Sequence, residues 1–89
     1  MKVEFDKSFE KSLSKIQNPI ILQRLSRIIT QLEVSSSLSQ VRNIKKLTGY
    51  SKYYRIRIGD YRIGLELINR TTIRCIIIVH RKDIYKIFP

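Results

Sequence analysis

Cysteine, histidine and acidic side chains are scarce in this sequence: of 89 residues, one is cysteine, one is histidine and seven are aspartate or glutamate. A single cysteine cannot form an internal disulfide, and together with one histidine it makes no metal-binding constellation. Long apolar runs are also absent, since the longest, Cys75 to Val79, is far too short to cross a bilayer. We therefore expect a soluble cytoplasmic protein that uses no metal or cofactor and does not contact a membrane.

Positive charge is abundant and unevenly distributed. The chain has 18 Lys and Arg residues, a net charge of +11 and a pI near 10.2. Residues 1–41 carry a net of +2 and residues 42–89 a net of +9. Such a balance points to a polyanionic partner, most simply nucleic acid, bound by the C-terminal half. The length allows one small domain, residues 1–89.

A β-hairpin is the clearest local pattern, in the stretch YYRIRIGDYRIGLEL from Tyr53 to Leu67. Apolar side chains alternate with arginine on both sides of Gly59-Asp60, which is the period of half-buried strands. Glycine at the first central position suits a two-residue type II′ turn. Counting outward from the turn predicts five facing pairs: Ile58 with Tyr61, Arg57 with Arg62, Ile56 with Ile63, Arg55 with Gly64, and Tyr54 with Leu65. One face is then apolar and the other carries arginine.

The facing arginines, Arg57 and Arg62, require compensation, because like charges directly opposite each other on a sheet destabilise it by roughly 0.2–1 kcal/mol. A carboxylate such as Glu66 on the same face would supply it in a structural role, and so would a phosphate held by the guanidinium groups. Gly64 has no side chain opposite Arg55, which leaves room for a ligand. The pattern alone leaves both a solvated basic face and an anion site open.

The N-terminal half reads as a strand followed by two helices. Residues 1–5 alternate as a short edge strand. Asp6 is the expected N-cap of a first amphipathic helix that runs to about Gln17. Asn18 and Pro19 suit the N-cap and first position of a second helix.

The C-terminal half reads as sheet. Residues 34–42 hold four serines without periodicity and are expected to form a loop. The run from Thr72 to Val79 is too apolar for an exposed strand, so we place it centrally, with helices over one face. Cys75 lies within it and is expected to be a core residue. The last segment, residues 82–89, is either one or two helical turns packed on the sheet or a tail ordered by a partner.

A basic cluster is predicted where these strands end. An antiparallel course brings His80 and Arg81 beside the strand that begins at Tyr61, and so close to Arg62. Basic side chains bind phosphates, and an aromatic side chain can stack on a base of single-stranded RNA. A lone histidine is commonly structural, but arginines nearby would lower its pKa and favour a neutral base. The candidate residues are Arg55, Arg57, Arg62, His80, Arg81 and Tyr85, with Lys45 and Lys46 adding charge near the hairpin.

These motifs, in this order, resemble a known family. The string RIRIGDYRIG, followed about fifteen residues later by VHRKDIYKIF and preceded by two helices and a KLTG lead-in, is similar to the RelE/ParE superfamily of toxins from type II toxin–antitoxin pairs. The resemblance covers nearly the whole chain. It implies an α+β fold in which two N-terminal helices pack on a small, mostly antiparallel four-stranded sheet (β-α-α-β-β-β), with a short C-terminal helix.

The RelE-like branch implies ribosome-dependent cleavage of mRNA in the A site by metal-free attack of the ribose 2′-hydroxyl. Its basic and aromatic positions correspond here to Arg55, Arg57, Arg62, Arg81 and Tyr85. The resemblance assigns Arg62 and Arg81 to the phosphate and Tyr85 to stacking or orienting a nucleotide. Where some relatives have lysine this chain has Arg55 and Arg57, and arginine is no credible general base. That duty is left to His80, or to positioning and the ribosome.

Two other functions stay open. The ParE-like branch implies inhibition of DNA gyrase without a nuclease centre, although retention of all the positions above favours the RelE-like branch. A small basic nucleic-acid-binding protein without toxicity is the third reading. Membership of either branch implies a cognate antitoxin as partner, packed on the toxin in a hetero-oligomer.

Overall fold

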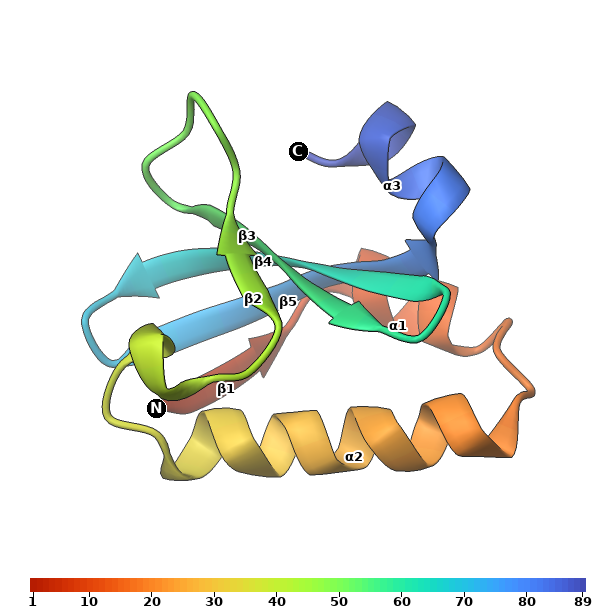
Figure 1. Ribbon diagram of the computed structural model, residues 1–89, viewed down its shortest axis with the longest axis horizontal. Helices are drawn as coiled ribbons and strands as arrows, with labels where there is room; N and C mark the ends of the chain where they lie inside the picture. Colours follow the sequence, from red (N-terminus) through yellow and green to blue (C-terminus); the bar gives the residue numbers. More distant parts are fainter.

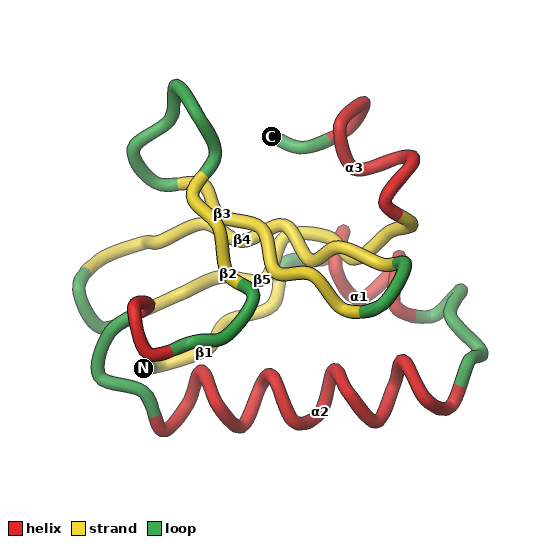
Figure 2. Tube along the Cα trace, viewed as in Figure 1, coloured by secondary structure: helices red, strands yellow, loops and turns green.

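Helices cover both faces of one twisted sheet in the computed structural model, which describes residues 1–89 (Figures 1 and 2). In chain order the elements are β1 (Lys2–Phe5), α1 (Lys7–Leu13), α2 (Pro19–Val34), a short 3-10 turn (Leu38–Gln40), β2 (Ile44–Lys46), β3 (Tyr53–Ile58), β4 (Tyr61–Asn69), β5 (Thr72–His80) and α3 (Arg81–Ile87). The predicted α+β class is confirmed. The C-terminal segment is a helix packed on the sheet.

The sheet has five strands in the order β1-β5-β4-β3-β2. Only β1 runs parallel to its neighbour, β5, and the other pairs are antiparallel. The prediction of four strands is corrected to five, because β2 was not among the strands predicted. Three residues are too few to show an alternating pattern by themselves. The predicted edge position of β1 and interior position of β5 are both confirmed.

The β3–β4 hairpin has the register expected from its turn. All five predicted pairs are present, including Arg57 opposite Arg62 and Arg55 opposite Gly64. Gly59 has φ of +61° and Asp60 does not have a positive φ, which is the pattern of a turn that needs glycine at its first central position. Register is fixed here by local sequence alone.

The first helix is shorter than expected. Asp6 caps it by accepting a hydrogen bond from the Ser8 N–H at 3.1 Å, and hydrogen bonds from Ser8 lower the pKa of the Asp6 carboxyl. The α-helix ends at Leu13 rather than near Gln17, and i→i+3 bonds continue the coil, with the Ile16 N–H donating to the Leu13 carbonyl at 3.0 Å. This tighter turn still buries Ile16, which is why the apolar period runs past the helix end.

The second helix begins where it was expected. The Asn18 side chain accepts hydrogen bonds from the N–H groups of Ile20 and Ile21 at 2.9 and 3.3 Å, and Pro19 takes the first position. Its apolar stripe buries Ile21, Leu25 and Leu32 against the sheet. No helix of the structure combines the length and apolarity needed to span a membrane.

Two apolar cores lie on opposite faces of the sheet. The larger joins α1 and α2 to the face that carries Ile56, Ile58 and Ile63. The smaller joins α3 to the other face through Leu47, Ile84 and Phe88. The prediction that helices cover one face of β5 is therefore corrected to both faces, and this double coverage explains why β5 is so apolar.

Candidate functional site

The hairpin arginines share one face of the sheet. Side chains alternate along a strand, so Arg55 and Arg57 lie opposite to the buried Ile56 and Ile58. Arg62 faces Arg57 in the register and lies on the same side. This is the face on which α3 packs. We call it the arginine face.

The two lysines of β2 fall on different faces. Lys45 pairs with Arg55 and Lys46 with Tyr54, and directly paired residues of an antiparallel ladder share a face. Lys45 therefore extends the arginine face, whereas Lys46 lies on the side of Tyr54, which packs against the larger core. Both lysines were expected to add charge near the hairpin, and the register brings only Lys45 onto the arginine face.

Tyr85 lies against one of the arginines, Arg55. The Arg55 guanidinium carbon is 4.5 Å from the centroid of the Tyr85 ring, which is cation–π stacking. The tyrosine is 71% exposed, so the rest of its ring is open to solvent. Arg55 and Tyr85 also line a surface pocket of about 370 Å³ together with Thr48 and Tyr50. A nucleobase has an aromatic surface to stack on here.

Arg62 is anchored by its own turn. Its Nη1 donates hydrogen bonds to the carbonyls of Gly59 at 2.9 Å and Tyr61 at 2.8 Å. A guanidinium has five N–H donors, so this anchoring leaves Nε and Nη2 for a ligand. The beginning of α3 is tied to the same turn, because the Arg81 N–H donates to the Asp60 carbonyl at 2.8 Å. Arg62 and Arg81 therefore start from backbones that the turn holds together.

His80 lies apart from the arginines of the predicted cluster. It pairs with Tyr61 rather than with Arg62, and the two rings meet edge to face at a centroid distance of 5.9 Å. Its Nδ1 accepts a hydrogen bond from the Lys82 N–H at 3.2 Å and caps α3. His80 lines a pocket of about 460 Å³ beside Lys11 on α1, away from the arginine face. His80 therefore lies at the expected end of the sheet, but on the opposite face from the arginines.

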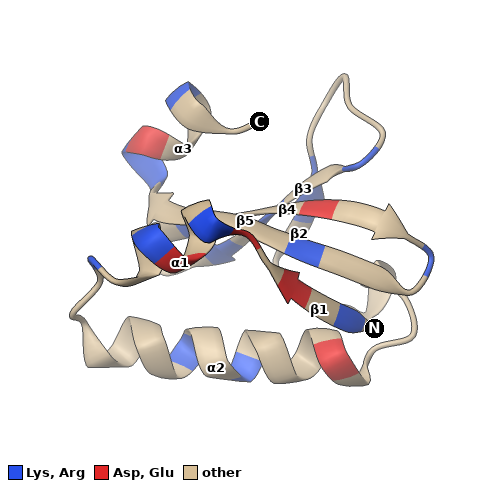
Figure 3. Ribbon diagram, turned by 180° about the vertical axis from the view of Figure 1, so that it is seen from behind, with Lys and Arg blue, Asp and Glu red and all other residues tan.

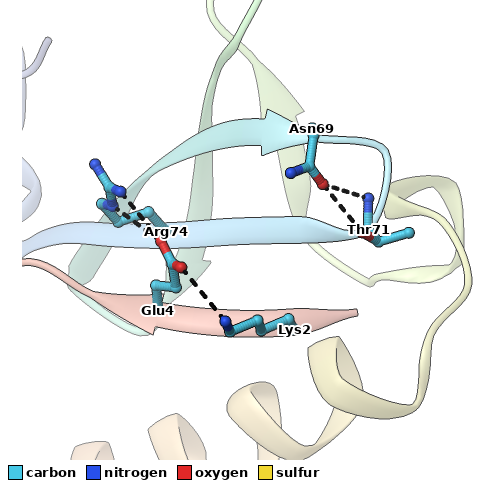
Figure 4. A network of polar contacts seen from close by, with 5 residues as sticks. All are labelled: Lys2, Glu4, Asn69, Thr71 and Arg74. Carbon is cyan, nitrogen blue, oxygen red and sulfur yellow. Dashed lines mark hydrogen bonds and ion pairs between the residues drawn. The ribbon is translucent and has the colours of Figure 1, made fainter.

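No carboxylate neutralises the arginine face. Both ion pairs of the structure are made by Glu4, with Arg74 at 3.1 Å and Lys2 at 3.9 Å, on the β1–β5 side of the sheet (Figure 4). Glu66, which was considered as a counter-charge, forms no ion pair. Acidic segments are visible in Figure 3 on α1, β1, β4, α3 and the end of α2, and the sequence from Val34 to Gly59 contains no acid. The arginine face is thus open to an external anion.

The space expected over Gly64 is occupied. A Cβ built on Gly64 would lie 2.7 Å from Cδ1 and Cγ of Phe88, and the Phe88 ring is also 5.6 Å from that of Tyr53. Gly64 therefore admits an aromatic side chain of the same protein, not a ligand. Sequence reasoning missed this contact, and the only signal was a glycine within a strand with an aromatic near the chain end.

Comparison with known proteins places this geometry in a family. A model described as the ParE toxin of the type II toxin–antitoxin system parDE matches residues 3–85. Toxin RelE3 of Methanocaldococcus jannaschii is 46% identical over 90 residues, which covers the whole of both chains.

Solved structures agree. The RelB–RelE antitoxin–toxin complex from Methanococcus jannaschii matches with a TM-score of 0.81 and 43% identity, over 97% of this chain and 99% of that one. The archaeal RelE–RelB complex from Pyrococcus horikoshii matches with a TM-score of 0.71 and 23% identity, over 90% and 93% of the two chains, which shows the shared fold. This chain therefore belongs to the RelE/ParE family of toxins of type II toxin–antitoxin systems, and within it is RelE-like.

Proposed function

We propose that this toxin is a ribosome-dependent endoribonuclease that cleaves mRNA in the A site. One observation carries the proposal: an exposed aromatic ring, Tyr85, is stacked on Arg55 beside arginines that have no carboxylate partner. Stacking recognises a base of single-stranded RNA, and guanidinium groups recognise its phosphates. These are the two chemical features of the substrate.

The reaction would need the RNA itself, positioned cations, and transfer of a proton from the 2′-hydroxyl and of a proton to the leaving 5′-oxygen. The ribose 2′-oxygen attacks the adjacent phosphorus, the bond from phosphorus to the 5′-oxygen breaks, and the products are a 2′,3′-cyclic phosphate and a 5′-hydroxyl end. Negative charge grows on the phosphate oxygens during the attack. Preorganised donors aimed at such charge often supply the largest catalytic term. Arg62, through Nε and Nη2, and Arg81 would supply them.

Proton transfer is the step for which the chain is least equipped. Arginine does not deprotonate in proteins, and His80 lies on the other side of the sheet with Nδ1 engaged in the cap of α3. We therefore do not assign His80 as the general base. The ribosome would complete the site, so the proposal implies that only translated message is cut.

A cognate antitoxin would neutralise the toxin. The relatives from Methanococcus jannaschii and Pyrococcus horikoshii were crystallised as complexes of RelE with RelB. An excess of positive charge and an uncovered arginine face suit an inhibitor that carries acidic side chains. We expect a toxin–antitoxin hetero-oligomer in the cell.

The test is to induce the protein briefly in cells and map new RNA 5′ ends against the reading frame. Cuts in translated message, in phase with codons, are expected from the wild type and not from Arg62→Ala or Arg81→Ala. Arg70→Ala is the matched control, because Arg70 is exposed in the β4–β5 turn, far along the sheet from α3. Cuts that persist in both variants would show that the site is misassigned.

A second function has one observation in its favour, namely the description of the matching family model as a ParE toxin. Inhibition of DNA gyrase would give growth arrest with DNA damage and intact transcripts. The same induction experiment separates the two functions, because intact message during arrest excludes the nuclease.

A further inference from the structure

Four arginines, of which only Arg57 belongs to the arginine face, converge beside α2. Arg24 and Arg27 of α2, Arg42 and Arg57 line one surface pocket of about 290 Å³, together with the amides of Gln31 and Asn43. All four arginines are exposed. We call this the arginine pocket.

Backbone structure holds the four side chains in place. Arg24 and Arg27 are three residues apart and so share a face of α2. Asn43 has a φ of +61°, a left-handed conformation that asparagine tolerates, and its carbonyl accepts a hydrogen bond from the Arg57 N–H at 3.1 Å. That bend sets Arg42 beside the end of β3. The arginine pocket is therefore built from three separate segments of the chain.

Nothing in the protein satisfies these guanidinium groups. None of the four forms an ion pair, since both ion pairs belong to Glu4, and none donates a side-chain hydrogen bond. A single arginine of this kind would be an ordinary solvated residue. Four around one pocket repel each other, so the arrangement favours an anion between them.

The composition of the lining indicates which anion. Only Ile28 and Ile58 are apolar among the eight lining residues, so the arginine pocket offers little to the apolar face of a partner helix. It is continuous with the arginine face, because Arg57 and Asn43 also line a neighbouring pocket with Lys45 and Arg55. A chain of phosphates can follow this path from one pocket to the next.

We propose that the arginine pocket is a second phosphate-binding site, which holds the RNA backbone several nucleotides away from the residue stacked on Tyr85. The inference rests on the proposed function in taking RNA as the ligand. It differs from that function in assigning no part of the reaction to Arg24, Arg27 or Arg42. These residues bind and orient a longer substrate.

The test measures binding rather than cleavage. Fluorescence anisotropy is recorded over a range of potassium chloride concentrations with single-stranded 2′-O-methyl oligonucleotides, which lack the attacking hydroxyl and stay intact. Arg24→Gln/Arg27→Gln is compared with Lys7→Gln/Arg70→Gln, which removes the same charge from exposed positions outside the arginine pocket. Each protein is measured with a trinucleotide, which fills only the Tyr85 region, and with a dodecanucleotide. Circular dichroism checks that every variant is folded.

Removing charge from the arginine pocket should change the salt dependence of binding for the dodecanucleotide and not for the trinucleotide. The slope of log Kd against log salt is expected to fall by about 1.4 for the dodecanucleotide in Arg24→Gln/Arg27→Gln, at about 0.7 per phosphate contact, and to stay unchanged for the trinucleotide. The control should keep the wild-type slope with both probes. Equal slopes in the two double variants would overturn the inference and leave RNA binding intact. Absence of RNA binding by the wild type would overturn both proposals, whereas normal binding without cleavage of message on ribosomes would remove the nuclease alone.

Discussion

The guanidinium of Arg55 lies over the ring of Tyr85, 4.5 Å from its centroid, and so joins β3 to α3. An exposed cation–π contact of this kind contributes about 0.5–1 kcal/mol. Its effect on the site is larger than its effect on stability, because it holds an otherwise exposed ring in one orientation. One face of the ring is used by the protein, and the other is available to a base. Arginine, tyrosine and nucleobase would then form a single stack.

Tyr85→Ala and Tyr85→Phe distinguish stacking from hydroxyl chemistry. Stacking of a base on an aromatic side chain contributes about 1–3 kcal/mol, so we expect Tyr85→Ala to reduce cleavage of A-site mRNA on purified ribosomes by about tenfold or more. Tyr85→Phe keeps the ring and should retain most of the activity. The melting temperature should change little in either variant, since Tyr85 is 71% exposed. Equal losses in both variants would assign the role to the hydroxyl instead.

Gly64→Ala should displace α3. The added Cβ would lie 2.7 Å from the Phe88 ring, and overpacking of a buried site commonly costs about 1–3 kcal/mol. Because Phe88 anchors the end of α3, the shift should also disturb the stack of Tyr85 on Arg55 and lower the affinity for single-stranded RNA. Urea unfolding measures the first effect and fluorescence anisotropy the second.

A double-mutant cycle shows whether Phe88 is the cause. In a Phe88→Ala background the clash is gone, so Gly64→Ala should cost much less there than in the wild type. The two residues are in contact, and non-additive free energies of unfolding are expected for such a pair. Additive costs would mean that Gly64 is required for a reason other than the approach of Phe88.

Asn18→Ala tests a cap that the sequence alone located. Loss of the two hydrogen bonds from the Asn18 side chain to the start of α2 should reduce the free energy of unfolding by about 0.5–2 kcal/mol. Thr30→Ala is the control, because Thr30 is exposed within α2 and alanine is the better helix former. Equal destabilisation by the two substitutions in urea unfolding would argue against capping.

Features that depend on adjacent residues were predicted from the sequence, whereas features that depend on long-range packing were not. The hairpin register and the start of α2 depend on a few adjacent residues, and both were predicted correctly. Strand β2 could not be predicted from adjacent residues, because its three residues form a strand only by pairing with β3. The contact of Phe88 with Gly64 depends on how α3 packs on the sheet, and the residues adjacent to either one in the sequence do not predict that packing.

The misplacement of His80 has a different origin. Its position beside the start of β4 was predicted correctly, but its face was not. Along β5 both faces are apolar, so the sequence shows no alternation that would reveal which way His80 points. Pairing with Tyr61 settles it, because that tyrosine shares a face with the buried Ile63. When both faces of a strand are apolar, only the strand register shows on which side of the sheet its last residue lies.

Ionisation of Cys75 should lower the stability of the protein as pH rises. Burial raises the pKa of the Cys75 thiol to about 12, whereas a cysteine in an unfolded chain has a pKa of about 8.5. Above that lower value the unfolded state loses the proton while the folded state keeps it, so stability falls as pH rises. The contribution of the thiol is complete below about pH 8.5 and should be lost at about 1.4 kcal/mol per pH unit towards pH 12.

Cys75→Ala isolates this effect from the tyrosines and lysines that titrate in the same range. Those groups are common to both proteins, so their contributions cancel in the difference between the two free energies of unfolding. The wild type is expected to lose stability faster than Cys75→Ala between about pH 9 and 11, as measured by urea unfolding at several pH values. The native thiol should also react slowly with a disulfide reagent until the protein unfolds, because the thiolate is the nucleophile. A difference in stability that does not change with pH would show that the thiol titrates alike in the folded and unfolded states, and that Cys75 is not held in an apolar site.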